Sequence, residues 1–289
     1  MVDQTRLRQS SGLILRLAQV SAMTYYEMRM LWRRRMLPVL VLSLIMIAGL
    51  ALIAWRVLAK TDLPSEVLSN VLLVRLSNNV IIGYTFWPLA YILLLIMGGL
   101  LVADVVPRDG QLGVGIVIDS TPLARITYLS GKLCGAWAAL LMGLAAAMVV
   151  IGVLGWLIVG PYDIGVYARM WIGGLMPLGL LHVGLCLLLT APLPTRRKAI
   201  MLGLVYGVIC VLLLQGGSGV SAATAWGLLN PARPYALYYY WLGWMGELSL
   251  LDTAIGYAEA RWSIAIGVLE LGLVGLCVWA WLRAREGRV

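Results

Sequence analysis

The sequence contains one histidine, His182, and only 12% of its 289 residues are charged. A haem held by two histidines of one chain therefore does not fit this sequence. The four cysteines stand in apolar runs and form no CxxC pair, so neither a disulfide framework nor a cysteine metal site is indicated. No serine occupies a GxSxG nucleophile elbow. We expect no catalytic residue, no metal and no cofactor in this chain.

Apolar residues dominate instead, at 62% of the chain with a mean hydropathy of +0.92. A soluble domain of this size has too much surface to hide so many apolar side chains. Apolar runs of about eighteen residues or more are typical of transmembrane helices. The sequence therefore predicts an all-α polytopic membrane protein, and we place six transmembrane helices at 37–58, 81–103, 133–159, 170–191, 199–215 and 262–282.

The lysines and arginines predict the orientation of these spans. With the N-terminus inside the cell, sixteen of the 22 basic residues lie on the cytoplasmic side, seven of them in 1–36 and three each in 104–132, 196–198 and 283–289. Positive charge collects on the cytoplasmic side of membrane proteins. We therefore expect both termini in the cytoplasm, a location in the cell (inner or plasma) membrane, and no nucleic-acid partner despite the net charge of +9.

Three parts of the chain follow from this layout: an N-terminal segment 1–36, a transmembrane domain 37–282 and a cytosolic tail 283–289. In the N-terminal segment Leu13, Leu17 and Val20 recur at helical spacing, and Met28 and Leu31 resume the stripe. This pattern favours an amphipathic helix at the membrane interface, although an ordinary basic run before a span is the alternative. The long segment 216–261 should lie on the outer side, where its many tyrosines and tryptophans suit an aromatic belt.

Residues 119–132, "DSTPLARITYLSGK", interrupt the apolar sequence with a helix start. Ser120 or Thr121 is a suitable N-cap, and Pro122 fits the first helical position. The helix should continue through Gly131 and Lys132 into the third span, with Lys132 as an anchor at the membrane edge. "SGKL" is not a phosphate-binding P-loop, because the first glycine of that motif and the serine or threonine after its lysine are both missing.

Two polar residues stand deep in apolar runs. Glu270 lies in the last span, where a charged carboxylate costs several kcal/mol, so it should face protein or water, or be protonated. A proton-relay or substrate role and a packing role are both open for Glu270. His182 lies in the fourth span, and we expect a hydrogen-bonded core histidine rather than a ligand.

Upstream of the helix start, 104–115 reads as a short charged and glycine-rich turn after the second span. Val114, Ile116, Val117 and Ile118 then form an apolar patch flanked by charge. The patch is either a docking site for a partner or a surface that packs against the membrane.

The stretch "RDGQLGVGIVIDSTPLARITYLSGKLCG" resembles the first cytoplasmic loop of ABC-2 type transporter permeases. The resemblance rests on an [S/A]-T-P-x-[S/A]-R element and a Y-L-x-G-K element. The matching residues are Arg108, Asp109, Gly113, Ser120, Thr121, Pro122, Arg125, Tyr128, Leu129, Gly131 and Lys132. The six-span layout is similar to that family as well.

The resemblance implies the permease subunit of an ATP-driven transporter, usually an exporter, of the type V exporter-like architecture. Two permease copies, or a copy and a homologous permease, would pair among the membrane lipids, and separate cytosolic ABC ATPase subunits would carry ATP and Mg. The 104–132 loop would couple the ATPase to the spans. Its expected coupling residues are Arg108, Asp109, Ile116, Val117, Thr121, Pro122, Arg125 and Lys132.

One departure concerns the coupling segment, where family members commonly carry an acidic pair and this chain has Gly115 and Ile116. The alternative function is a non-transporting membrane anchor subunit of a larger cytosolic or redox complex, with 104–132 as a static docking site. Identification of an ATPase partner would distinguish the transporter from the anchor.

Overall fold

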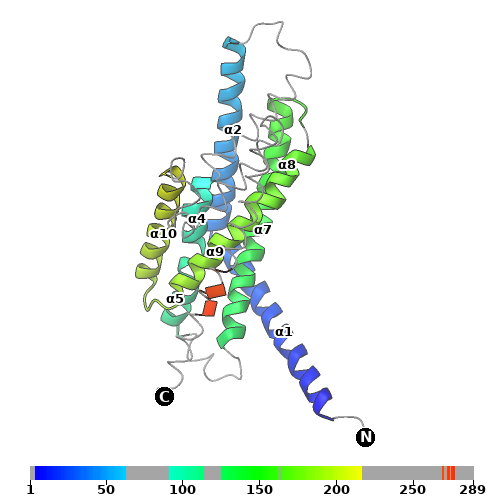
Figure 1. Ribbon diagram of the computed structural model, residues 1–289, viewed down its shortest axis with the longest axis vertical. Helices are drawn as coiled ribbons and strands as arrows, with labels where there is room; N and C mark the ends of the chain where they lie inside the picture. The colour runs from blue at the N-terminus through cyan, green and yellow to red at the C-terminus, as the bar shows by residue number, and fades with distance from the viewer. Residues whose placement is uncertain are drawn as a thin grey trace.

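The computed structural model describes residues 4–62, 91–113, 125–162, 164–216, 269, 272–273 and 275–276. Every regular element in these ranges is a helix, and they contain no strand (Figure 1). The helices are α1 (Gln4–Arg33), α2 (Met36–Asp62), α4 (Tyr91–Ala103), α5 (Val105–Gln111), α7 (Arg125–Ile158), α8 (Ile164–Met170), the π-helix η2 (Trp171–Leu175), α9 (Met176–Thr190) and α10 (Arg196–Gly216). The all-α expectation is thus confirmed for the described part of the chain.

Two of these helices are long and apolar enough to cross a membrane, Met36–Ala54 within α2 and Ile126–Ile158 within α7. They coincide with the first and third expected spans. The second expected span is described only as α4, and the fifth corresponds to α10. The sixth span and the segment 216–261 lie almost entirely outside the described residues.

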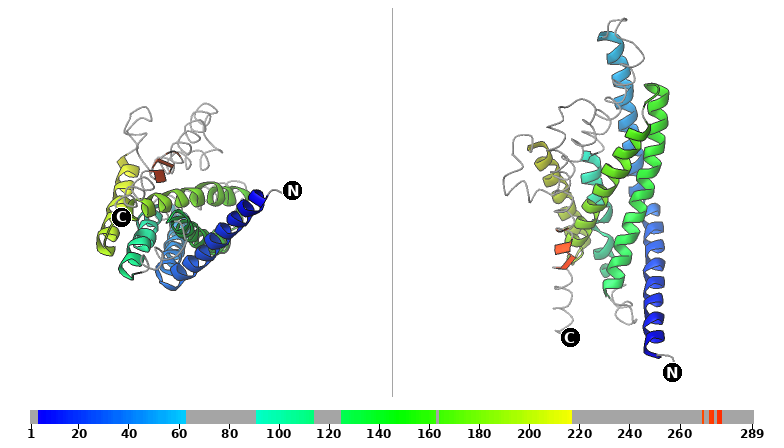
Figure 2. Two further views of the ribbon diagram at one scale, coloured as in Figure 1. Left: turned by 90° about the horizontal axis from the view of Figure 1, so that it is seen from below. Right: turned by 45° about the vertical axis from the view of Figure 1, so that its right-hand side comes forward.

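Helix α7 lies at the centre of the arrangement and packs against α1, α2 and α9. On the other side of the bundle α4 packs against α9 and α10. Figure 1 shows α2 and α7 running close to the long axis, α9 crossing them obliquely, and α1 leading away from the bundle toward the N-terminus. Helices α1, α4 and α9 finish, and α7 and α10 begin, at one end of the bundle (Figures 1 and 2).

Glycines on one face of α7 let the neighbouring helices approach closely. A Cβ atom added to Gly131 would lie 2.7 Å from Cβ of Met23, and one added to Gly135 would lie 2.6 Å from Cβ of Glu27. About two turns further along α7, a Cβ atom added to Gly143 would lie 3.0 Å from Cδ1 of Leu37 in α2. Small residues at four-residue spacing allow such helix contacts. This groove positions α1 against the start of α7.

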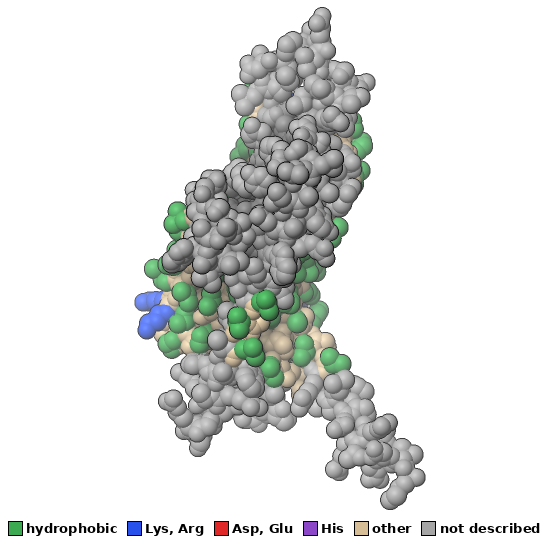
Figure 3. All heavy atoms as spheres, viewed as in Figure 1, with side chains coloured by type: hydrophobic (Ala, Val, Ile, Leu, Met, Phe, Trp, Pro, Cys, Tyr) green, Lys and Arg blue, Asp and Glu red, His purple; other side chains and the backbone are tan. Residues whose placement is uncertain are grey.

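The outward faces of the long helices are apolar. In α2, Leu40 and Leu44 are buried, whereas Leu42, Met46 and Leu50 on the opposite side are exposed. Figure 3 shows hydrophobic side chains scattered over the described part of the visible face, with lysine and arginine confined to one small area. A helix whose outer face is as apolar as its inner face suits a membrane environment rather than water.

The fourth span differs from the expectation of one regular helix over 170–191. The helix begins earlier, at Ile164, and the π-helix η2 interrupts it at Trp171–Leu175. Pro177 follows directly in the first turn of α9. Because proline has no N–H and its ring displaces the carbonyl four residues earlier, it breaks the regular hydrogen-bond ladder at this point.

The segment after the second span also differs from the expectation. It is not a simple turn, since residues Val105–Gln111 form the short helix α5 directly after α4. The backbone N–H of Arg108 donates to the carbonyl oxygen of Asp104 at 3.0 Å, which is the hydrogen-bond pattern of an α-helix. Pro107 is tolerated because the first turn of a helix needs no N–H donor there. This helix presents Arg108 and Asp109 to the rest of the bundle.

Candidate functional site: a buried ion-pair network

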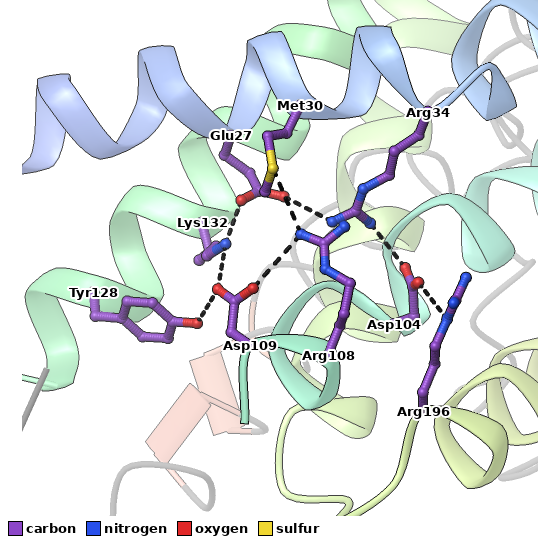
Figure 4. Close-up of polar contacts among 9 residues, drawn as sticks. All are labelled: Glu27, Met30, Arg34, Asp104, Arg108, Asp109, Tyr128, Lys132 and Arg196. Carbon is purple, nitrogen blue, oxygen red and sulfur yellow. Dashed lines mark hydrogen bonds and ion pairs between the residues drawn. The ribbon is translucent and has the colours of Figure 1, made fainter. Parts of the chain in front are cut away.

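Seven charged residues and one tyrosine meet at the end of the bundle where α7 and α10 begin (Figure 4). We call them the ion-pair network. Its members are Glu27 and Arg34 at α1, Asp104, Arg108 and Asp109 at α5, Tyr128 and Lys132 of α7, and Arg196 of α10. In the chain these residues are up to 169 positions apart, so the network depends on the tertiary fold.

Lys132 is the centre of one half of the network. Its Nζ donates to Oε2 of Glu27 and lies 2.7 Å from Oδ2 of Asp109. The hydroxyl of Tyr128 donates to the same Asp109 oxygen at 2.7 Å. Lys132 is only 3% exposed. The expectation of a membrane-edge anchor is therefore wrong for Lys132, because its ammonium group points into the protein.

Asp104 is the centre of the other half. Arg34 donates through Nη1 to Oδ1 of Asp104 at 3.0 Å, and Arg196 donates through Nε to Oδ2 at 2.9 Å. Nη2 of Arg34 also lies 4.0 Å from Oε1 of Glu27, which links the two halves. Arg196 is about half exposed, whereas Asp104 is buried.

The network balances buried charge. Glu27, Asp104 and Asp109 are 1%, 7% and 6% exposed, and the largely buried cations Arg34, Arg108 and Lys132 match them in number. Moving isolated charges out of water costs several kcal/mol each, and pairing recovers this only when the partners are well placed. The four helices must therefore keep their relative positions for these charges to stay paired.

Burial also shifts the titration of two of the carboxyls. It raises the pKa of Glu27 above the usual value, against the opposing effect of the Lys132 ammonium group. It raises the pKa of Asp104 in the same way, against the opposing effect of the Arg196 guanidinium. Both carboxyls accept a proton more readily here than in water, because desolvation disfavours the charged form.

Helical spacing aligns these residues locally. Arg34, directly after the end of α1, is seven positions from Glu27, and Tyr128 and Lys132 are four positions apart on α7, so each pair lies on one side of its helix. On α1 this face also carries Met23 and Leu31 against α7. The expected apolar stripe matches this face only in part: Leu31 is buried, whereas Leu17 is 60% exposed, and the charged Glu27 is buried on the same face.

The structure unites some of the residues that the sequence singled out and leaves others untested. Arg108, Asp109 and Lys132 of the expected coupling loop meet in the network. Arg125 begins α7, but its side chain lies outside the described residues. Four further loop residues, and the intramembrane candidate, also lie outside them: Ile116, Val117, Thr121, Pro122 and Glu270.

His182 lies away from the network, between α4 and α10. Its Nε2 is 2.7 Å from the carbonyl oxygen of Leu95, and its ring stacks on Tyr206 with the centroids 5.0 Å apart. The side chain is buried. This is the geometry of a hydrogen-bonded core histidine that fixes α9 against its neighbours.

Sequence reasoning missed Glu27, Arg34, Asp104 and Arg196 as site residues. A signal was present for Glu27, which is a carboxylate in a segment otherwise rich in arginine, and for Asp104, which directly follows an apolar run. The arginines carried no such signal, because a basic residue beside a span is already explained by membrane topology.

Replacing Arg196 by glutamine should have a small effect. Arg196 is about half exposed, and Asp104 keeps its second partner Arg34, so we expect a loss of about 1 kcal/mol or less in the free energy of unfolding. Thermal unfolding in detergent, compared with the same substitution at the exposed neighbour Arg197, measures this. A large loss would mean that solvent does not screen the Arg196 pair.

A scan of the chain against models of known protein families finds no match, and a search of curated proteins finds no relative. The described residues contain no cluster of histidine, cysteine, aspartate or glutamate that could hold a metal ion. The charged groups of the ion-pair network can hold four helix ends together. Through these contacts, a displacement of one helix end can be transmitted to the other three.

Proposed function

We propose that the chain is the permease subunit of an ABC-2 transporter that exports an unidentified substrate. In this proposal it has six transmembrane helices, both termini in the cytoplasm, and a location in the cell membrane. It pairs with a second permease and receives energy from a separate cytosolic ABC ATPase. Two helices that are long and apolar enough to cross a membrane support the membrane location.

The ion-pair network is the observation that carries the proposal. It binds α5, which opens the loop resembling the family's coupling segment, to α1, α7 and α10. An ATPase that pushed on this loop would act on a segment tied by buried charges to three other helices. A static anchor needs no such ties.

The length of α7 agrees with this assignment. Its 34 residues extend about 50 Å at 1.5 Å per residue, whereas the hydrocarbon core of a bilayer is about 30 Å thick. The first turns, with Tyr128 and Lys132, can therefore stand in the cytosol while the apolar remainder crosses the membrane. A movement of α5 would reach the spans through Asp109 and Lys132.

Affinity purification of the full chain from its native membranes in mild detergent tests the proposal. We expect a soluble protein with Walker A and B motifs to co-purify, together with a second permease copy or a homologous permease. Recovery of a stable complex with no nucleotide-binding subunit, or with redox subunits in its place, would favour the anchor function instead.

Leu112 offers a local test at the tip of α5. It is 69% exposed and its neighbours Gly110 and Gln111 are also exposed, so the side chain is free to contact a partner. Replacing Leu112 by aspartate should lower recovery of the ATPase at least several-fold, because the charge would be buried on docking. The melting temperature of the purified variant should stay unchanged. Full ATPase recovery with the variant would place the contact elsewhere.

A further inference from the structure

The junction between α1 and α2 holds a residue in an unfavourable backbone conformation. Helix α1 ends at Arg33, α2 begins at Met36, and between them Arg35 has φ of 61°. This is the left-handed region, which glycine adopts freely and which costs other residues about 1 kcal/mol or more. Helices often end on such a residue, but it is usually glycine or asparagine.

Pro38 makes the alternative, one continuous helix from α1 into α2, unfavourable as well. It lies within the first turn of α2, where its missing N–H is harmless. In a continuous helix, the carbonyl of Arg34 would have no N–H donor at Pro38, and the proline ring would crowd that carbonyl. Both the bent and the straight junction therefore carry a cost, and tertiary contacts decide between them.

Arg34 makes the polar contacts at the bent junction, in addition to the packing of α1 against the glycines of α7. It stands directly before the left-handed residue and donates to Asp104 at 3.0 Å, with Glu27 at 4.0 Å. Leu31, before the junction, and Leu37, after it, are fully buried, so the ends of both helices pack into the core. Arg34 is thus the polar link between the junction and the start of α5.

We infer that the α1–α2 junction is a hinge, with Arg35 as the strained pivot and the Arg34–Asp104 ion pair as its latch. While the latch is closed, α1 and α5 move as one unit. When Asp104 moves away, the junction loses the contact that holds the left-handed conformation, and α1 changes its angle to α2. The hinge does not depend on the transport function.

Distance measurements between spin labels on α1 and α2 test the hinge. Ser21 and Leu50 are exposed, so cysteines there, in a background whose native cysteines are alanine, can carry the labels. With the latch intact we expect one narrow distance distribution. Arg34→Gln and Asp104→Asn should each broaden it at least twofold, and Arg197→Gln should leave it unchanged. Equal widths in all four proteins would overturn the latch.

The pivot has a separate test that leaves the latch in place. Arg35→Gly should keep the narrow distribution and raise the melting temperature by about 2 °C, because glycine adopts the left-handed conformation without strain. A lower melting temperature would show that Arg35 is not strained and would overturn the pivot. This arm tests the pivot even if the latch variants fail to fold. Failure of the hinge would leave co-purification with an ATPase unaffected, so the two proposals are tested independently.

Discussion

Replacing Lys132 by methionine is expected to lower the free energy of unfolding by about 3–5 kcal/mol. The change removes the cation that faces two buried carboxylates, Glu27 and Asp109, and leaves both without their closest positive partner. Breaking one side of a buried ion pair costs this much because the remaining charge stays desolvated. Chemical or thermal unfolding of the purified protein in detergent provides the measurement.

Lys198→Met is the matched control, since Lys198 is an exposed lysine at the start of α10. We expect it to change the free energy of unfolding by less than about 0.5 kcal/mol. A double-mutant cycle with Glu27→Gln should show that the Lys132 and Glu27 substitutions cost less together than the sum of the two alone. If Lys132→Met were as stable as the control, the ion-pair network would not stabilise the bundle.

Replacing Gly135 by alanine is expected to have the next largest effect. The added Cβ would lie 2.6 Å from Cβ of Glu27 and 3.0 Å from the carbonyl oxygen of Thr24, and neither atom is the flexible end of a side chain. Helix α1 must therefore move away from α7. We expect a loss of about 1–3 kcal/mol in the free energy of unfolding, which is typical of overpacking, together with weaker pairing between Glu27 and Lys132.

Gly110→Ala provides the comparison, because a Cβ at that helical glycine meets no atom within 4 Å. We expect no loss of stability there, and a slight gain is consistent with the higher helix propensity of alanine. Equal melting temperatures for the two alanine variants would contradict the close contact of α1 with α7.

The sequence predicted helix positions better than it predicted contacts. Apolar runs gave the cores of α2 and α7, because a span must be apolar over its whole length. The π-helix at Trp171–Leu175 was not foreseen, since Pro177 signals a break without indicating how the backbone accommodates it. Helix α5 was missed because its glycine and proline are typical of turns.

The network illustrates the same limit at the level of side chains. Tyr128 and Lys132 are four positions apart, and both reach Asp109, because spacing along one helix is a local property. The pairing of Lys132 with Glu27 spans 105 positions and depends on the glycine groove of α7. In the sequence, a charged residue beside a span indicates only membrane topology. The packing of α1 against α7 shows that Glu27 and Lys132 form a buried ion pair.

Site-specific photocrosslinking at Leu112 tests the central claim most directly. A photoreactive amino acid at this exposed position would mark whatever contacts the tip of α5 in native membranes. The proposed function predicts a covalent adduct with a soluble subunit that carries Walker A and B motifs, and no such adduct from the same amino acid at Leu157, an equally exposed leucine near the far end of α7. Adducts with lipid alone, or with a protein that lacks nucleotide-binding motifs, would contradict the assignment of this loop to an ATPase.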